Sequence, residues 1–563
     1  MSKQVSTNIL VQRRVNLISE LCGCDHLVSA RIMDEIMLPM ADRVCLHTLI
    51  FRPSLQPCSV IATRSSYPFQ EPIYRMTAEY FCSHGFAYVV QYCRGCGKSE
   101  GVWEPNVNER ADGLEMMDWL SRQSWVRNIG YFGCSYLALT GWAMADALPK
   151  KVKTMFLSHY GVFRHTSAFQ DGMFRHDVLT NWTMRSAGFP IEADFIESCL
   201  YHPHICVDTD LWGRKLPWYR DWVSNADPNS SYWKNGFWGM LAQVPGKVKI
   251  PICMLEGWYD HHLGSALKTF EGLPSDVKSH SRMIIGGWGH NFGMYLEDRE
   301  CHNADNVELT HALEWFEMVL KKETLPEGQV RAYTIQKDSW RIRKSSQPPH
   351  ILSFYLSGQE ADKHCTLQTD KPSEAGAVSY VFNPEHPVPT HGAESLLFMT
   401  DEIGSLRQPE PSYRPDVLSF ISALLQAPIT ISGSITVPLT VSTDAEDTAF
   451  SVKIMEVTKD GIAYNIRSGI TSIAYRNHGS PESYAPGQRV NLEVVLWDIE
   501  WQLQPGSRIR LDISSSDFPQ YAIHSNFSGS WAEQAITRPA QQHIYWGGNA
   551  ISCVRIPVTN TES

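Results

Sequence analysis

Gly133-Cys134-Ser135-Tyr136-Leu137 is the stretch of the chain that decides the fold. An apolar run at 129–132 precedes it and predicts a strand, and residues 137–145 follow as a predicted helix. A serine on a sharp strand-to-helix turn exposes its hydroxyl at the top of a sheet, and the next backbone N–H faces the oxygen that becomes negative during attack. The small Gly133 lets the strand and helix approach closely. We therefore predict a nucleophile elbow; an ordinary βα turn is the alternative.

Two later segments repeat the pattern of a buried strand that ends at a chemically active side chain. Residues 251–259 form an apolar run before Asp260, and residues 282–289 form another before His290. Open α/β sheets carry their chemistry at the carboxyl ends of strands, and the order Ser, Asp, His is that of the α/β-hydrolase fold. Taken singly, Asp260 could be a helix N-cap and His290 a loop histidine. Together with Ser135 they predict a catalytic triad.

Composition excludes several classes of protein. The chain has 563 residues, so we expect two or three domains. Its net charge of −11, from 49 basic and 60 acidic residues, leaves no basic surface for nucleic acid. No stretch is long and apolar enough to span a bilayer, and residues 1–8 lack the apolar core of a signal peptide. We expect a cytoplasmic protein without a membrane partner.

The cysteines do not predict a metal site or a disulfide framework. Fourteen cysteines in a large chain without a signal peptide favour free thiols. Cys93 and Cys96 have C-x-x-C spacing, but no second pair stands at the distance that a zinc finger needs. We expect no metal and no cofactor.

The pattern of expected strands and helices changes three times along the chain and predicts three parts. Strands and helices alternate over residues 1–151, with 1–28 as an N-terminal extension, and this pattern resumes over 246–347. Residues 152–245 between them are rich in aromatic side chains and helical segments, which indicates a cap inserted over the sheet. Residues 348–563 are dominated by strands such as 429–437 and 508–514, in which apolar and polar residues alternate. This last part predicts a β-sandwich of the jelly-roll type.

Several further motifs are spread along the chain in one order. They are residues 38–44 with Arg52-Pro53, 94–101, Asp112, Asp118-Trp119, Trp125, 257–260, 288–290, 383–390 and 514–519. With these motifs, the chain from about residue 28 onward resembles the cocaine-esterase-like hydrolases of the X-prolyl dipeptidyl-peptidase superfamily. The resemblance implies an α/β-hydrolase core with an inserted helical cap and a C-terminal jelly roll.

The resemblance also implies a second donor to the oxyanion hole. A tyrosine hydroxyl early in the core has this role in the family, and it corresponds to Tyr67. Its partner is the backbone N–H of Tyr136, and a phenol suits the task because it donates one directed hydrogen bond. Cys134, which adjoins the nucleophile, is expected to point away from the site and to pack.

The chain departs from the family where relatives that act on α-amino acid esters hold the ammonium of their substrate. Those relatives carry acidic residues just after the triad acid, whereas this chain carries His261 and His262. The difference argues against an α-amino-acyl substrate and for a neutral or anionic acyl group. The two histidines either contact the substrate or line the mouth of the pocket. Trp182 is the first candidate among the cap aromatics for shaping a mainly apolar pocket.

These residues predict a serine hydrolase that cleaves a carboxylic ester or, as a second choice, an amide, through an acyl-enzyme. An acyltransferase or transamidase that uses the same acyl-enzyme is one alternative, and an X-prolyl or α-amino-acyl peptidase or ester hydrolase is another. A binding protein on an inactive hydrolase scaffold is a further, non-enzymatic alternative. The expected partner is a small-molecule ester or amide. A homo-oligomer is left open, with residues 1–25 as the candidate contact.

Overall fold

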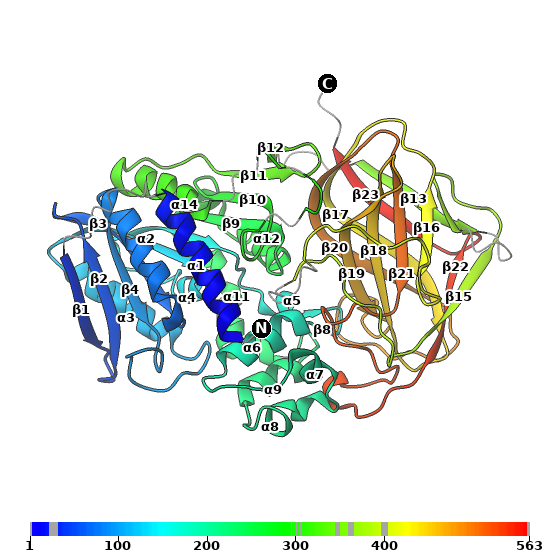
Figure 1. Cartoon of the computed structure of the whole chain (residues 1–563), viewed down its shortest axis with the longest axis horizontal. Helices are drawn as coiled ribbons and strands as arrows, with labels where there is room; N and C mark the ends of the chain where they lie inside the picture. Colours follow the sequence, from blue (N-terminus) through cyan, green and yellow to red (C-terminus); the bar gives the residue numbers. More distant parts are fainter. Residues whose placement is uncertain are drawn as a thin grey trace.

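The molecule contains two large β-sheets, and helices lie around the first sheet and below the place where the two meet (Figure 1). The computed structural model describes residues 3–21, 32–293, 296–299, 301–303, 307–343, 350–358, 365–395 and 403–559. Within these residues, no helix combines the length and the apolar character that crossing a membrane requires.

The first sheet has ten strands in the order β1-β2-β4-β3-β5-β6-β9-β10-β11-β12. Its strands run parallel from β4 to β11, and only its two edges are antiparallel. Both β3 and β9 are buried along their whole length, as expected for strands that helices cover on both faces. The strands are β1 (Ile32–Pro39), β2 (Cys45–Arg52), β3 (Cys58–Ser65), β4 (Ala87–Tyr92), β5 (Val126–Cys134), β6 (Val152–Ser158), β9 (Ile252–Tyr259), β10 (Arg282–Gly289), β11 (Gln329–Thr334) and β12 (Ser339–Arg343).

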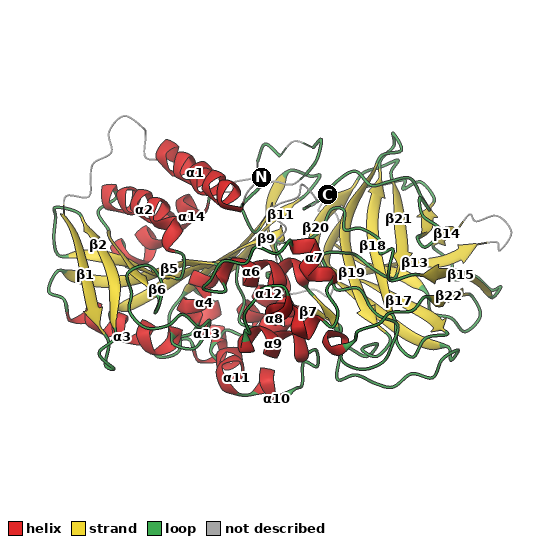
Figure 2. Ribbon diagram, turned by 60° about the horizontal axis from the view of Figure 1, so that its bottom comes forward, coloured by secondary structure: helices red, strands yellow, loops and turns green. Residues whose placement is uncertain are grey.

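Helices cover both faces of this sheet (Figure 2). On one face lie α1 (Lys3–Leu21), α2 (Glu71–Ser83) and α14 (Glu308–Phe316). On the other lie α3 (Glu109–Arg122), α4 (Tyr136–Trp142), α12 (Leu263–Glu271) and α13 (Ser275–Lys278). The crossover helices place the carboxyl ends of β5, β6, β9 and β10 next to one another at one edge of the sheet.

A helical insertion lies between β6 and β9. It contains α5 (Arg164–Ala168), α6 (Asn181–Ser186), α7 (Phe195–Leu200), α8 (Val207–Asp210), α9 (Pro217–Ser224), α10 (Ser231–Lys234) and α11 (Gly236–Gln243), with a small hairpin of β7 (Phe169–Gln170) and β8 (Met173–Phe174). The sequence-based boundary at residue 152 comes too early, because 152–158 is strand β6, which pairs with β5 and β9 inside the sheet. The helical part therefore begins after Ser158; the division into domains is otherwise a prediction.

The second sheet has eleven strands, and all of its pairings except β14 with β16 are antiparallel. The alternating segments of the sequence form β17 and β21. The predicted fold class, an α/β core followed by a largely antiparallel C-terminal β-structure, is confirmed. The strands are β13 (His350–Gly358), β14 (Cys365–Gln368), β15 (Gly376–Phe382), β16 (Leu418–Ser422), β17 (Ile429–Thr443), β18 (Ala449–Val457), β19 (Ala463–Ser472), β20 (Val490–Leu503), β21 (Arg508–Ser514), β22 (Ala540–Trp546) and β23 (Cys553–Thr559).

The N-terminal extension contributes helix α1, while residues 22–28 lie outside the described part of the chain. Ile18 of α1 is 3% exposed and joins the apolar core beneath α2. Arg14 forms an ion pair with Glu308 of α14 at 2.5 Å. Glu308 also accepts a hydrogen bond from Ser158 at the end of β6. Helix α1 is thus fastened to the elements behind the site.

Buried Arg175 joins the helical insertion to the second sheet. Its guanidinium pairs with Asp177 at 2.8 Å and donates to the backbone carbonyl of Glu394. It also lies over the rings of Trp497 and Tyr521, at 5.4 and 5.3 Å from their centroids. Because these partners come from both parts, the second sheet is packed firmly against the insertion.

Candidate active site

Ser135 lies on the sharp turn between β5 and α4. Its backbone has φ 57° and ψ −123°, a conformation that non-glycine residues seldom adopt outside functional turns. A Cβ on Gly133 would lie 2.3 Å from the carbonyl oxygen of Leu137, so only glycine fits there. The N–H of Ser135 donates to the carbonyl oxygen of Ser158 on β6 at 2.9 Å. The turn therefore holds the serine hydroxyl at the carboxyl edge of the sheet.

Ser135, His290 and Asp260 form one hydrogen-bonded chain. Nε2 of His290 lies 3.0 Å from Oγ of Ser135, and Nδ1 of the same ring lies 2.8 Å from Oδ2 of Asp260. Asp260 follows β9 and is fully buried, and His290 follows β10. Because an ionised carboxylate only accepts, Nδ1 carries the proton and Nε2 is left to accept from the serine. The structure thus brings the three sequence-predicted residues together in the geometry of a Ser-His-Asp triad.

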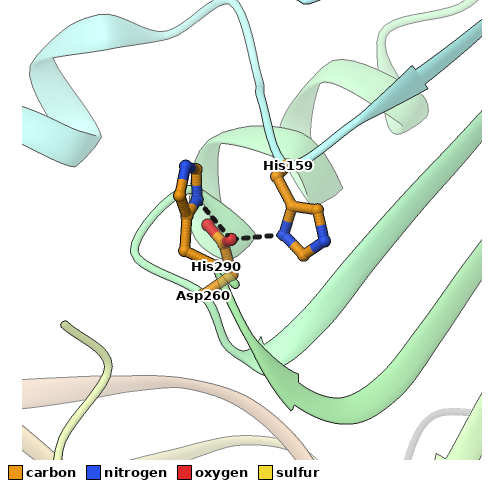
Figure 3. A group of neighbouring side chains, drawn as sticks. All are labelled: His159, Asp260 and His290. Carbon is orange, nitrogen blue, oxygen red and sulfur yellow. Dashed lines mark hydrogen bonds and ion pairs between the residues drawn. The ribbon is translucent and has the colours of Figure 1, made fainter. Parts of the chain in front are cut away.

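A second imidazole shares the carboxylate of Asp260 (Figure 3). Nδ1 of His159 bonds to Oδ2, the oxygen that also receives His290. His159 is fully buried directly after β6, with φ 54°, and Phe292 packs edge-on against its ring at a centroid distance of 4.4 Å. Sequence reasoning missed His159 because residues 152–158 were assigned to the helical cap. The available signal was an apolar run that ends at a polar side chain, the same pattern that precedes Asp260.

Two neighbouring carboxyl groups in this region favour opposite protonation states. Burial tends to raise the pKa of Asp260, but His290, His159 and His261 outweigh burial and hold that pKa well below its ordinary value. Glu256 of β9 is fully buried as well. Burial first, and the charge of Asp260 second, raise the pKa of Glu256 well above its ordinary value. One negative charge, that of Asp260, is therefore available to stabilise a protonated His290.

Tyr136 and Tyr67 supply hydrogen-bond donors close to the nucleophile. Tyr136 directly follows Ser135 as the first residue of α4, so its N–H has no acceptor within the helix. The ring of Tyr67 lies 6.4 Å from the ring of Tyr136 between centroids. Nε1 of Trp182 donates to the Tyr67 hydroxyl oxygen at 2.9 Å, which leaves the phenolic proton for another acceptor. Burial raises the pKa of Tyr67 to about 12, so the hydroxyl keeps its proton at neutral pH.

A pocket with an empty volume of about 380 Å³, its opening included, lies beside Ser135. Trp182, His261 and His262 all line it, as do nine others: Asn106, Ser135, Tyr136, Leu139, Tyr160, Arg164, Val178, Trp222 and Trp238. His261 and His262 are each 2% exposed, so they lie inside the pocket. Burial is the main cause that lowers the pKa of both imidazoles well below the ordinary value. Both rings are therefore neutral in the folded protein at pH 7.

Cys134 lies behind the nucleophile, near Arg14 of α1. Burial raises the pKa of its thiol, which therefore stays protonated. The thiol is unsuited to nucleophilic attack, which needs the thiolate.

Comparison with known proteins places the chain in a family. Residues 42–291 match the model of X-Pro dipeptidyl-peptidase (S15 family), and residues 322–554 match that of the X-Pro dipeptidyl-peptidase C-terminal non-catalytic domain. The chain belongs to the S15 family. This S15 chain is 27% identical over 575 residues to the cocaine esterase of Rhodococcus sp. (strain MB1 Bresler). The aligned region covers 94% of this chain and 98% of the relative.

Solved structures share the fold of this S15 chain. An aminopeptidase from a marine sediment archaeon, Thaumarchaeota archaeon, matches with a TM-score of 0.82 at 19% identity, over 94% of this chain and 96% of its own. An α-amino acid ester hydrolase matches with a TM-score of 0.79 at 20% identity, over the same shares. These structures show the fold; that the chain is a hydrolase rests on its match to the S15 family model.

The same side chains meet the distance requirement of a metal site. Among the residues that the structure describes, the ligand atoms of His159, Asp260 and His290 lie within 4.8 Å of one another. Both rings, however, direct Nδ1 at the carboxylate in hydrogen-bonding geometry, and a metal would need those nitrogens deprotonated. A metal would also separate His290 from the oxygen that orients it toward Ser135. The arrangement in this S15 chain fits a hydrogen-bonded triad better than a metal centre.

Proposed function

We propose that this chain hydrolyses a carboxylic ester through a covalent acyl-enzyme on Ser135. The observation that carries the proposal is the continuous chain from Oγ of Ser135 through His290 to the buried Asp260, with distances of 3.0 and 2.8 Å. The nucleophile of this chain lies at the carboxyl edge of a parallel sheet, on a sharp turn that requires glycine at position 133. The S15 family supports the coarser assignment as a hydrolase.

The proposed reaction uses His290 first as a base and then as an acid. As Oγ of Ser135 bonds to the acyl carbon, its proton passes to Nε2 of His290, and Asp260 stabilises the imidazolium. The N–H of Tyr136 and the hydroxyl of Tyr67 donate to the oxyanion. The imidazolium then protonates the leaving alcohol as its C–O bond breaks. Water attacks the acyl-enzyme with His290 as the base, and the returned proton restores Ser135 as the acid leaves.

The pocket favours an ester substrate without an ammonium group. A carboxylate is the partner that best compensates the charge of a free α-amino group when the group is taken out of water. Among the described residues, those that line the pocket include no aspartate or glutamate. Trp182, Trp222 and Trp238 present apolar surface instead. These observations support a neutral or anionic acyl group over an α-amino-acyl or X-prolyl substrate.

A stopped-flow assay with activated acetyl, butyryl, benzoyl and aminoacyl esters tests the proposal. We expect a burst of released alcohol from the wild type, and no burst from Ser135→Ala. Ser121→Ala is a matched control, because Ser121 lies on α3, outside the pocket lining, and its hydroxyl donates to the Met117 carbonyl oxygen of its own helix. A fluorophosphonate that labels Ser135 while every ester stays uncleaved would contradict ester hydrolysis. An unlabelled Ser135 would contradict the triad itself.

A further inference from the structure

Arg164, the first residue of α5, lines the pocket beside Ser135. Its side chain is unusual for a charged group because it is only 8% exposed. Its Nε is buried without a hydrogen-bond partner, and no ion pair or side-chain hydrogen bond joins the guanidinium to another residue in the described part of the chain. The guanidinium lies 5.0 Å from the centroid of the Trp222 ring, a cation–π contact that brings no negative charge.

Other buried arginines in this chain have a carboxylate partner. Arg64 pairs with Asp112 at 3.4 Å, and Arg467 pairs with Glu394 at 2.8 Å. Such pairing is the rule for buried charges, because a guanidinium that leaves water without a partner loses its solvation uncompensated. Arg164 breaks this rule at the wall of the pocket that contains the nucleophile.

The surroundings of Arg164 do not neutralise its charge. Burial is the main cause that lowers its pKa, and the groups that act in the opposite direction are hydroxyls, those of Tyr160, Tyr232, Tyr67 and Tyr136. A guanidinium nevertheless remains protonated at neutral pH, since its ordinary pKa exceeds 12. The pocket wall therefore carries a positive charge that no carboxylate of the described residues pairs with.

The other lining residues in the described part of the chain add no second charge. His261 and His262 are neutral, as described above, and the carboxylate of Asp260 is already engaged by His290 and His159. A single fixed cation among tryptophan rings suits an anion with one negative charge on an apolar chain. A carboxylate fits better than a phosphate, because it is planar like the guanidinium fork and brings no second charge.

We propose that Arg164 binds a carboxylate on the acyl chain of the substrate, so that this hydrolase acts on monoesters of dicarboxylic acids. This inference rests on the proposed ester hydrolysis and names its substrate class. Arg164 holds the far carboxylate while Ser135 attacks the ester carbonyl, and the aromatic walls cover the methylene groups between them. The acyl-enzyme keeps the same contact, because the acyl chain stays attached to Ser135 until water releases it.

The test compares pairs of substrates that differ only in charge. The monoethyl esters of succinic, glutaric and adipic acid are each paired with the keto ester in which a methyl group replaces one carboxylate oxygen. We expect the wild type to have a higher kcat/KM for the acid than for the keto ester in at least one pair. The length of the preferred acid then reports the spacing between Ser135 and Arg164.

Variants of Arg164 then assign the preference to this side chain. Arg164→Met keeps an apolar chain against Trp222 but removes the charge. We expect it to lower the acid-to-keto-ester ratio of kcat/KM about ten- to a hundredfold, as for a hydrogen bond to a charged group. Arg164→Lys keeps the charge without the fork, and we expect an intermediate ratio. Arg214→Gln is the matched control, because Arg214 is an exposed arginine of the same insertion outside the pocket lining, and both substrates are expected to react as in the wild type.

Binding of free adipate by calorimetry provides a readout that does not need turnover. We expect Ser135→Ala to bind adipate, and the double variant with Arg164→Met to bind it at least about tenfold more weakly. Equal kcat/KM for acid and keto ester in the wild type, or an unchanged ratio in folded Arg164→Met and Arg164→Lys, would overturn the carboxylate subsite. Keto-ester turnover that is lost in Ser135→Ala would in that case leave the proposed ester hydrolysis standing. Arg164-dependent adipate binding without any ester turnover would instead retain the subsite and refute the hydrolysis.

Discussion

Tyr67→Phe removes one hydroxyl and keeps the ring, so it separates loss of catalysis from loss of packing. In the ground state this hydroxyl accepts one hydrogen bond, from Nε1 of Trp182 at 2.9 Å. Losing that neutral bond costs about 0.5–1.5 kcal/mol of unfolding free energy. Losing one oxyanion donor costs about 2.7–4 kcal/mol of transition-state stabilisation, which is about a hundred- to a thousandfold in kcat. We therefore expect a large fall in kcat and a small loss of stability.

Stopped-flow acylation with an activated ester measures the first quantity, and urea unfolding measures the second. Tyr88→Phe is the matched control, because Tyr88 is a buried tyrosine of β4 whose hydroxyl donates to Oγ1 of Thr63 at 3.2 Å, away from the pocket. It is expected to lose similar stability and to keep the kcat of the wild type. A fall in kcat of less than about threefold in Tyr67→Phe, or one no larger than in Tyr88→Phe, would remove Tyr67 from the oxyanion hole.

Three further expectations concern the elbow, the shared carboxylate and pH. Gly133→Ala places a Cβ 2.3 Å from the Leu137 carbonyl oxygen. We expect this variant to lose about 1–3 kcal/mol of unfolding free energy and to show no burst of released alcohol in the stopped-flow assay. A burst as large as that of the wild type would contradict the tight turn. His159→Gln removes one of two imidazoles from Asp260, so kcat and its pH profile should change while KM stays the same; an unchanged profile would make His159 purely structural. Burial lowers the pKa of His204 from 6.5 to about 3. Between these two pH values the imidazole is protonated in the unfolded chain but neutral in the native protein. Urea unfolding should show stability falling as pH drops from about 6.5 toward 3, and less steeply in His204→Gln.

The arrangement of the core could be predicted because its signals are local and ordered along the chain. Ser135, Asp260 and His290 each follow an apolar run, and parallel strands bring such positions to one edge. The alternation in β17 and β21 likewise gave the C-terminal β-structure. Tyr67 carries no such signal, since a tyrosine before a proline in a turn has no chemical pattern. Its candidacy came from the family resemblance alone.

His159 and Arg164 could not be found in this way because their properties depend on packing between distant segments. The strand before His159 is difficult to recognise in the sequence because aromatic-rich residues follow it. The carboxylate that His159 shares belongs to Asp260, which lies directly after β9 and about a hundred positions later in the chain. Arg164 is notable for the absence of a carboxylate beside it within the described residues, and a sequence does not show which side chains fail to meet. His261 and His262 were correctly seen as neighbours of the acid, but their burial inside the pocket depends on the insertion that covers them.

Helix α1 gives the chain an assembly order that its sequence numbering conceals. Arg14 is made among the first residues, yet its partner Glu308 belongs to α14, which is synthesised only after the whole helical insertion. Glu308 in turn bonds to Ser158, whose carbonyl oxygen receives the N–H of Ser135. During synthesis Ile18 has its partners beneath α2 early, whereas Arg14 gains its ion pair only once α14 has been made. The contacts that back the nucleophile are therefore completed late in synthesis, by a helix that joins the earliest residues of the chain to the end of β6.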